Sequence, residues 1–196
     1  MQRTDHDLDL RRAQSGDEAA FTRVFRSVQP RLLRYLSVMA GPQSEDIAAE
    51  TWVRVARDLA GFRGDAEAFR AWVFRIARHR WIDHLRAVER RPAQTDDAVL
   101  EERAAPGGVV ESVEELMSTE AALRLIARLP RDQAEVVLLR VVAGLDVARC
   151  ADVLGKRPGA VRVLAHRGLA RLRALLPEPG PDRTFPLKRG VTESAP

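Results

Sequence analysis

Apolar side chains recur with the period of an α-helix along most of the first ninety residues. This 3.6-residue stripe predicts three helices, at about 17–41, 44–61 and 66–90. We expect the hydroxyl of Ser44 to cap the second helix, because the acids Glu45 and Asp46 that follow it favour a helix N-terminus. Alternation with period two, typical of a half-buried strand, is not sustained over a useful length. The pattern therefore predicts an all-α protein.

The second half of the chain predicts shorter helices, each ended by Gly or Pro. They lie at about 118–129, 132–143, 146–154 and 159–176. The intervening stretch 92–118 contains Pro and a Gly pair and shows no apolar periodicity, so we interpret it as a flexible linker. The tail 177–196 is rich in Pro at its start and is predicted to be disordered. We thus expect two small helical domains, 8–91 and 119–176.

The last two predicted helices form a helix–turn–helix pattern. Asp146 stands where an N-cap is needed, and Gly155 can take the positive φ that ends the first helix. On a helical wheel the second helix has one apolar face and one basic face. The turn and the basic face carry the candidate duplex-DNA contacts Lys156, Arg157, Arg162, Val163, His166, Arg167 and Arg173.

Charge distinguishes a DNA-binding helix pair from a helical hairpin whose arginines are merely solvated. The segment from Val153 to Pro177 contains no acidic residue. Acidic side chains would be repelled by phosphates, so their absence favours the DNA-binding interpretation.

The third predicted helix combines aromatic and basic residues. Five of the ten aromatic residues lie between Phe62 and Trp81. One arc of the helix is basic, with Arg75, Arg78, His79, Arg86 and Arg90. Single-stranded nucleic acid needs both charge and stacking groups, and this segment supplies both, with Trp72 as a stacking candidate. The alternative is that Trp72, Phe74 and Trp81 only belong to the core.

The charge is distributed in blocks that its sum conceals. The chain has a net charge of +4. Residues 1–91 carry +4, residues 92–119 carry −6, and residues 120–196 carry +6. Two basic blocks joined by an acidic stretch indicate a polyanionic partner.

Several classes of protein lack support in the sequence. No apolar run approaches the ~20 residues that span a bilayer, and no apolar leader follows Met1, so we expect a cytoplasmic protein without membrane insertion. There is no phosphate-binding Gly loop, nucleophile motif or metal-ligand spacing, and His79 and His84 fall on different helix faces. We therefore predict no catalytic residue, no metal and no cofactor. The only cysteine, Cys150, is expected to be a core residue.

Taken together, these blocks resemble the extracytoplasmic-function (ECF) group of the sigma-70 family of RNA polymerase sigma factors. The resemblance covers residues 8–91 and 119–176. It rests on the segments 16–21, 30–35, 45–52, 62–65, 69–78 and 83–86, and on Leu129-Pro130, 138–140, 144–145, 154–155, 159–162 and 166–167.

The resemblance implies that 8–91 is sigma region 2 and that 119–176 is region 4. Region 2 would bind the clamp of core RNA polymerase and open the minus-ten promoter element, and region 4 would read the minus-thirty-five element and touch the flap. Asp46, Ile47, Glu50 and Thr51 would lie on the polymerase-binding helix. The loop residues Arg63, Gly64 and Asp65 would capture a flipped base, and Arg75, Arg78, His79 and Arg86 would contact the melted strand.

Two departures from the family pattern bear on base recognition. Ala66–Ala68 makes the loop one residue longer than is common, and Val163–Ala165 replaces the more familiar Ser, Arg and Leu. The acidic linker could reach roughly 30 Å as a coil, and we hypothesise that it occupies a polymerase channel until RNA displaces it. A DNA-binding regulator that does not bind polymerase is the main alternative. An anti-sigma protein is a further partner that the resemblance leaves open.

Overall fold

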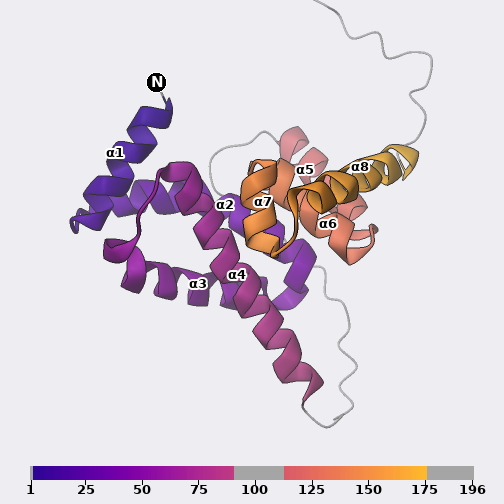
Figure 1. Cartoon of the computed structure of the whole chain (residues 1–196), viewed down its shortest axis with the longest axis horizontal. Helices are drawn as coiled ribbons and strands as arrows, with labels where there is room; N and C mark the ends of the chain where they lie inside the picture. Colours follow the sequence, from indigo (N-terminus) through magenta and orange to yellow (C-terminus); the bar gives the residue numbers. More distant parts are fainter. Residues whose placement is uncertain (1, 91–112, 176–196) are drawn as a thin grey trace, which may run out of the picture.

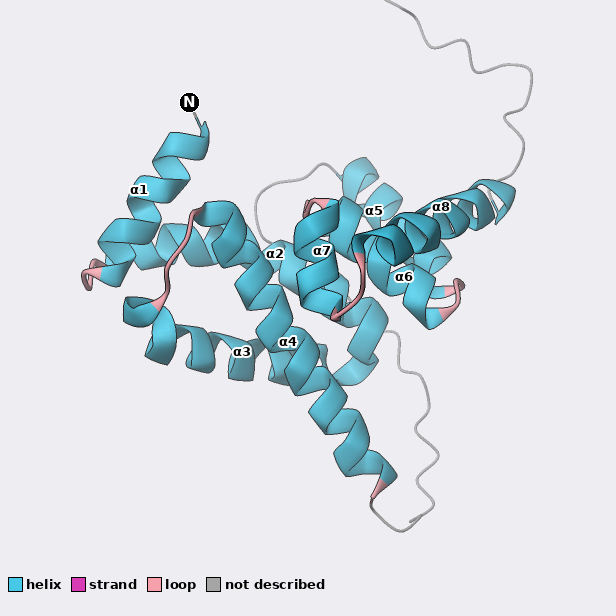
Figure 2. Cartoon of the chain, in the orientation of Figure 1, coloured by secondary structure: helices cyan, strands magenta, loops and turns pink. Residues whose placement is uncertain are grey.

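The computed structural model describes residues 2–90 and 113–175, with side chains for residues 5–90 and 119–175. Within these ranges every regular element is helical (Figure 2), which confirms the all-α prediction. The predicted tail 177–196 and most of the predicted linker lie outside the described residues.

Four helices make up the first half, here called the N-terminal bundle. They are α1 (Gln2–Gln14), α2 (Glu18–Ala40), α3 (Ser44–Asp58) and α4 (Ala66–Glu89), with short 3₁₀ turns at Gly41–Gln43 and Leu59–Gly61. Helix α1 packs on α2, and α3 packs on both α2 and α4 (Figure 1). The apolar stripe did not predict α1, because Leu8 and Leu10 are the only large apolar residues between Gln2 and Gln14.

Aspartates begin two of these helices. Asp17 accepts a hydrogen bond from the backbone N–H of Ala20 at 2.9 Å, and Asp65 accepts one from Ala68 at 2.7 Å. Each satisfies a donor that the first helical turn leaves free. The cap predicted for Ser44 is wrong: Ser44 is already the first residue of α3, and the side chain of the N-cap residue Gln43 makes no capping hydrogen bond. The 3₁₀ turn that precedes Ser44 sets the start of α3 instead.

The core of the N-terminal bundle lies between α2, α3 and α4. Large side chains that are fully buried include Leu32, Tyr35, Val55, Val73 and Phe74. The edge of Phe21 and the tilted ring of Phe25 pack against Trp52, with centroid separations of 6.1 and 4.7 Å. The predicted stripes therefore face the core, except at Val53 of α3, which is 70% exposed, and at the end of α4. There Val88 is 51% exposed, because α4 projects beyond the other helices (Figure 1).

The C-terminal bundle contains the other helices. These are α5 (Val113–Ala127), α6 (Arg131–Val137), α7 (Val147–Leu154) and α8 (Pro158–Leu175), with a π-helical segment η3 (Leu138–Val142) directly after α6. Helix α5 includes the last six residues of the stretch predicted as linker. The sequence Val-Glu-Glu-Leu-Met that begins it combines good helix formers with acids that favour a helix N-terminus.

Helices α7 and α8 form the predicted helix–turn–helix. Asp146 caps α7 by accepting from the backbone N–H of Arg149 at 2.7 Å, and Gly155 ends α7 in the left-handed conformation with φ 62°. Gly168 lets α8 lie close to α6: a Cβ placed there would be 2.9 Å from Cγ2 of Val137. The small residue therefore fixes how near the second helix of the motif approaches the core.

The two bundles are packed against each other. Helix α7 lies beside α4, and α2 contacts α5, α6 and η3 (Figure 1). The two domains predicted from the sequence are thus in direct contact in this arrangement, and this contact brings together residues that lie 57 to 100 positions apart in the chain.

Candidate nucleic-acid interface

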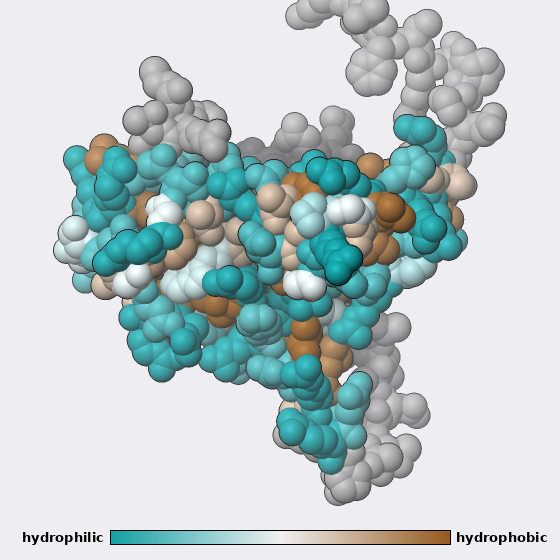
Figure 3. Space-filling view, viewed as in Figure 1, coloured by the Kyte–Doolittle hydropathy of each residue, from teal (hydrophilic) through white to brown (hydrophobic). Residues whose placement is uncertain are grey.

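The outer face of α8 carries the basic residues predicted for duplex DNA. Arg162, Val163, His166, Arg167 and Arg173 are all exposed, whereas Val161 and Gly168 on the opposite face are buried. The helical-wheel prediction for α8 is therefore confirmed as a matter of geometry. Figure 3 shows a face of the molecule that is mostly hydrophilic, with small and separate apolar patches.

The turn before α8 is less exposed to solvent than the outer face of α8. Nζ of Lys156 lies 3.2 Å from a carboxylate oxygen of Asp132, while Arg157 is exposed. A shallow pocket of about 500 Å³ lies between this turn and the start of α8 and includes Val163 in its lining. A phosphate that approached Lys156 would compete with the carboxylate of Asp132.

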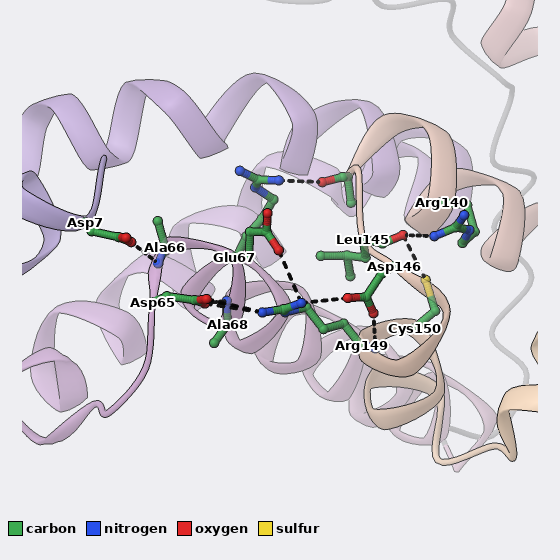
Figure 4. Close-up of polar contacts among 12 residues, drawn as sticks. Asp7, Asp65, Ala66, Glu67, Ala68, Arg140, Leu145, Asp146, Arg149 and Cys150 are labelled. Atoms are coloured by element: carbon green, nitrogen blue, oxygen red, sulfur yellow. Dashed lines mark hydrogen bonds and ion pairs between the residues drawn. The ribbon is translucent and has the colours of Figure 1, made fainter. Parts of the chain in front are cut away.

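The loop that leads into α4 is held by α1. The side-chain amide of Gln14 donates to the backbone carbonyls of Leu59 and Phe62, at 3.2 and 2.8 Å. A carboxylate oxygen of Asp7 accepts from the N–H of Ala66 at 2.7 Å (Figure 4). The sequence did not single out these residues, because short polar side chains of a surface helix carry no mark of a contact some 45 to 59 positions away.

Within this loop Gly64 has a conformation that favours glycine, with φ 150°. A Cβ at Gly64 would lie 2.9 Å from Cβ of Ala68 and 3.0 Å from the ring of Phe62. Asp65 is the N-cap of α4, and Ala66–Ala68 form its first turn, so the segment predicted to lengthen the loop by one residue lies within the helix. Arg63 is exposed and its guanidinium donates to the carbonyl of Ala60 at 3.1 Å.

Three aromatic rings pack beside this loop. The ring centroids of Phe62 and Trp72 are 5.0 Å apart and tilted by 30°, and both contact Phe69. Phe69 is buried, but Phe62 and Trp72 are only partly buried. Trp72 therefore packs on the core and also keeps an accessible edge, so it fits both the core interpretation and the stacking interpretation. Phe74 and Trp81 are buried core residues.

The C-terminal bundle covers part of the basic arc of α4 and leaves the rest exposed. Arg75, His79 and Arg86 are exposed. Arg78 is not: its Nε donates to a carboxylate oxygen of Glu135 at 2.8 Å, and its side chain is only 19% exposed. The structure thus places three of the four predicted strand-contacting residues on the surface and the fourth in an ion pair with α6.

Glu135 is buried and has a second partner, the hydroxyl of Tyr35, which donates to it at 3.1 Å. Burial, together with the nearby carboxylate, raises the pKa of Tyr35 well above its ordinary value. Sequence reasoning missed Glu135, although one signal was present: it is a lone acid in the apolar run from Ala134 to Leu139.

A second set of ion pairs joins α7 to the start of α4. The guanidinium of Arg149 lies 3.3 Å from Asp65, 3.2 Å from Glu67 and 2.6 Å from Asp146 (Figure 4). Beside it, a groove of about 1010 Å³ runs between the two bundles, lined by residues of both that include Phe62, Arg63, Trp72, Arg75 and Arg149. Arg149 was not among the site residues predicted from the sequence.

The predicted polymerase-binding residues of α3 separate into two pairs. Asp46 and Glu50 are exposed, while Ile47 and Thr51 are buried, and the Thr51 hydroxyl donates to the carbonyl of Ile47 at 2.7 Å. The direct contact predicted for Ile47 and Thr51 does not fit this burial, because these two residues, four positions apart, share the face of the amphipathic helix that packs on the core. Their role here is to pack α3 against its neighbours.

Cys150 is fully buried on α7, as expected for a core residue. Burial raises the pKa of its thiol to about 11. No helix in the described parts of the chain is both long and apolar enough to span a membrane.

Comparison with known families decides between the alternatives. Residues 24–91 match the family described as Sigma-70 region 2, and residues 119–172 match Sigma-70 region 4. The chain belongs to the sigma-70 family. It is therefore a promoter-directing RNA polymerase sigma factor, and the alternative of a DNA-binding regulator outside this family is excluded. The N-terminal bundle contains region 2 and the C-terminal bundle contains region 4.

Individual relatives place the chain in the ECF group of this family. The sigma factor is 38% identical to the ECF RNA polymerase sigma factor ShbA of Streptomyces griseus, over 85% of this chain and 92% of ShbA. It is 33% identical to the ECF RNA polymerase sigma factor BldN of Streptomyces coelicolor, over 86% of this chain but only 65% of BldN.

Solved structures show the same fold. The sigma factor RpoE of Bartonella quintana, in complex with the anti-sigma factor NepR, superposes with a TM-score of 0.62 at 20% identity, covering 79% of this chain and 95% of RpoE. CnrH, in complex with the cytosolic domain of CnrY, gives 0.59 at 22% identity, covering 87% of this chain and 96% of CnrH. Sigma factors are transcription initiation factors rather than enzymes.

Proposed function

We propose that this sigma factor divides promoter recognition between two helices, α4 for the melted minus-ten strand and α8 for the minus-thirty-five duplex. The observation that carries the proposal is the contrast between their surfaces. Helix α8 presents cations without aromatic groups, whereas α4 presents cations beside the accessible edges of Phe62 and Trp72. Duplex DNA calls for a helix that fits the major groove, and unpaired bases call for stacking surfaces.

The duplex part of the proposal is supported by the exposure and charge of α8. Arg162, His166 and Arg167 lie near one another on its solvent face, within reach of base edges and phosphates once the helix enters a major groove. Arg157 in the turn and Arg173 near the C-terminus would contact backbone phosphates at the two ends of the helix.

The single-strand part is supported by the loop before α4. Gly64 lets the backbone pass close to Phe62 and Ala68, where a side chain at position 64 would clash with both. Hydrogen bonds from Gln14 and to Asp7 hold this loop conformation in place. A base turned out of the strand would stack near Phe62 and Trp72, while Arg63, Arg75 and His79 contact the adjoining phosphates. Arg86 lies further along the same helix, where it would contact phosphates downstream in the strand.

Polymerase binding is assigned to the exposed acids of α3. Asp46 and Glu50 lie one helical turn apart on the solvent side, and Val53 beside them is 70% exposed. An acidic patch with an apolar neighbour is complementary to a partner surface that is basic and partly apolar, so we expect such a surface on the clamp of core polymerase. Since RpoE was solved with an anti-sigma factor, we include regulation by such a partner in the proposal.

Reconstituted transcription tests this assignment. Core polymerase and the full chain would be combined on a promoter identified by mapping start sites after overexpression. We expect R162A/R167A and R75A/H79A each to reduce specific transcripts at least about tenfold, which corresponds to the loss of one or two good contacts. R124A is the matched control, because Arg124 is an exposed arginine of α5 outside both surfaces. Full activity of either double variant would contradict the proposal.

A further inference from the structure

Helix α1 makes contacts that the family match of region 2 does not include. It lies before residues 24–91, which match the description of that region. Its polar residues nevertheless reach both ends of the loop that leads into α4, residues 62–65. Gln14 binds the backbone where the loop begins, and Asp7 binds the backbone just after it ends.

The side chain of Gln14 spends both hydrogens of its amide nitrogen on this part of the backbone. Its Nε2 lies 3.2 Å from the carbonyl oxygen of Leu59 and 2.8 Å from that of Phe62. A side-chain amide has two N–H donors, so both are used here. Leu59 is buried, whereas Phe62 is only partly buried. Gln14 therefore ties the backbone of Phe62 to a residue that is anchored in the core.

Asp7 acts at the other end of the loop. Its carboxylate accepts from the N–H of Ala66 at 2.7 Å, next to the N-cap bond in which Asp65 accepts from Ala68 (Figure 4). The first turn of a helix leaves its N–H groups without partners inside the helix, and the helix dipole favours a carboxylate there. Asp7 thus fixes the point at which the loop ends and α4 begins.

Phe62 connects these contacts to the surface proposed for a flipped base. Its ring lies against Trp72, with centroids 5.0 Å apart and planes tilted by 30°, while its carbonyl is held by Gln14. A flipped base is recognised by stacking and by the shape of its pocket, so discrimination between bases depends on where this ring lies. A residue that fixes the backbone of Phe62 can therefore affect specificity without touching DNA.

We propose that Gln14 and Asp7 are positioning residues that set the base specificity of the minus-ten pocket. Without either contact the loop would adopt several conformations, and these would accept different bases. The inference rests on the proposed function, in which this loop captures a base. It concerns discrimination rather than strand binding, because the cations of α4 are assigned to phosphates, which carry no base identity.

Variants of α1 separate positioning of the loop from general support of the fold. D7A removes the acceptor at Ala66, and D7N restores one, because the side-chain oxygen of asparagine also accepts. Q14M keeps an unbranched side chain of similar length but has no N–H donor. D9A is the matched control: Asp9 lies on the same helix, but its carboxylate binds Arg23 of α2 at 2.7 Å rather than the loop.

Hydrogen exchange of the backbone amides from Leu59 to Ala68 is measured first, on the full-length protein without DNA. We expect these amides to exchange at least about fivefold faster in D7A and Q14M, because a bond that restrains the loop is lost. D7N and D9A should exchange like the parent chain. Unchanged exchange in both D7A and Q14M would show that α1 does not hold the loop, and the inference would fail.

Reconstituted transcription with core polymerase then measures specificity, on promoters that carry each base in turn at every position of the minus-ten element. The readout is the ratio of transcripts from the best and the worst base, which cancels any loss of active protein. The captured position is the one whose ratio falls in W72A or F62A. There we expect D7A and Q14M to lower the ratio at least about fivefold, while D7N and D9A retain it.

Two results would overturn the inference in different ways. If D7A and Q14M reduce transcription equally for every base while W72A still lowers one ratio, α1 only supports the fold and the proposed function stands. If neither W72A nor F62A changes any ratio, these rings do not read a base, and the single-strand part of the proposed function fails together with the inference.

Discussion

Arg78 and Glu135 are 57 residues apart in the chain and form an ion pair of 2.8 Å between regions 2 and 4. The same carboxylate accepts the hydroxyl of Tyr35 from a different helix. One buried acid therefore joins α2, α4 and α6, and the arrangement of the two regions depends on it.

Y35F tests the contribution of this junction to stability. The ring of Tyr35 would keep its edge contact with Phe74 at 5.4 Å, but Glu135 would lose one donor. We expect a loss of about 1–3 kcal/mol in the free energy of unfolding, because the buried carboxylate would lose one of its hydrogen bonds. Urea unfolding followed by circular dichroism measures it, and an unchanged midpoint would show that the hydroxyl does not stabilise the fold.

G168A tests the close approach of α8 to α6. Alanine favours a helix by about 1 kcal/mol over glycine, yet here its Cβ would lie 2.9 Å from Val137. We expect the clash to prevail and to destabilise the protein by about 1–3 kcal/mol. G159A is the matched control, because a Cβ there meets nothing within 4 Å. Thermal unfolding should separate the two variants, and equal stabilities would refute the packing argument.

G64A tests the loop that leads into α4. A side chain at φ 150° is strained, and its Cβ would press on Phe62 and Ala68. We expect the fold to persist while specific transcription falls several-fold, since the loop could no longer hold its path. G61A, three residues earlier and in open space, should retain activity. If both variants transcribe equally well, the loop conformation has no part in initiation.

Cys150 offers a test of the folded core of region 4. Its thiol pKa is raised from 9.0 to about 11 by burial, so the folded protein holds the proton more tightly than the unfolded chain. This contribution to stability is present below pH 9 and is lost as the pH rises towards about 11. At pH 8 we expect a thiol reagent to modify Cys150 only after denaturant is added, and rapid modification of the native protein would contradict its burial.

The sequence predicted the helices and their faces because both depend on local periodicity. In α8, for example, the spacing of Val161, Arg162 and Gly168 along the helix is enough to predict which side faces the core. Contacts between distant segments have no such local signal. The bonds of Glu135 to Tyr35 and Arg78, and those of Arg149 to Asp65 and Glu67, do not follow from the residues near them in sequence. Helix α1 lacked the apolar stripe from which the other helices were predicted. Ile47 and Thr51 were placed on a binding surface by resemblance, whereas the turn of α3 buries them.

The division of labour between α4 and α8 is the central claim, and permanganate footprinting of the promoter in the presence of core polymerase tests it most directly, because it detects unpaired thymines. With the unaltered sigma factor we expect reactive thymines around the minus-ten element. R75A/H79A should leave the promoter bound, as judged by nuclease protection of the minus-thirty-five element, but unmelted, while R162A/R167A should lose both signals. Normal melting by R75A/H79A would contradict the account.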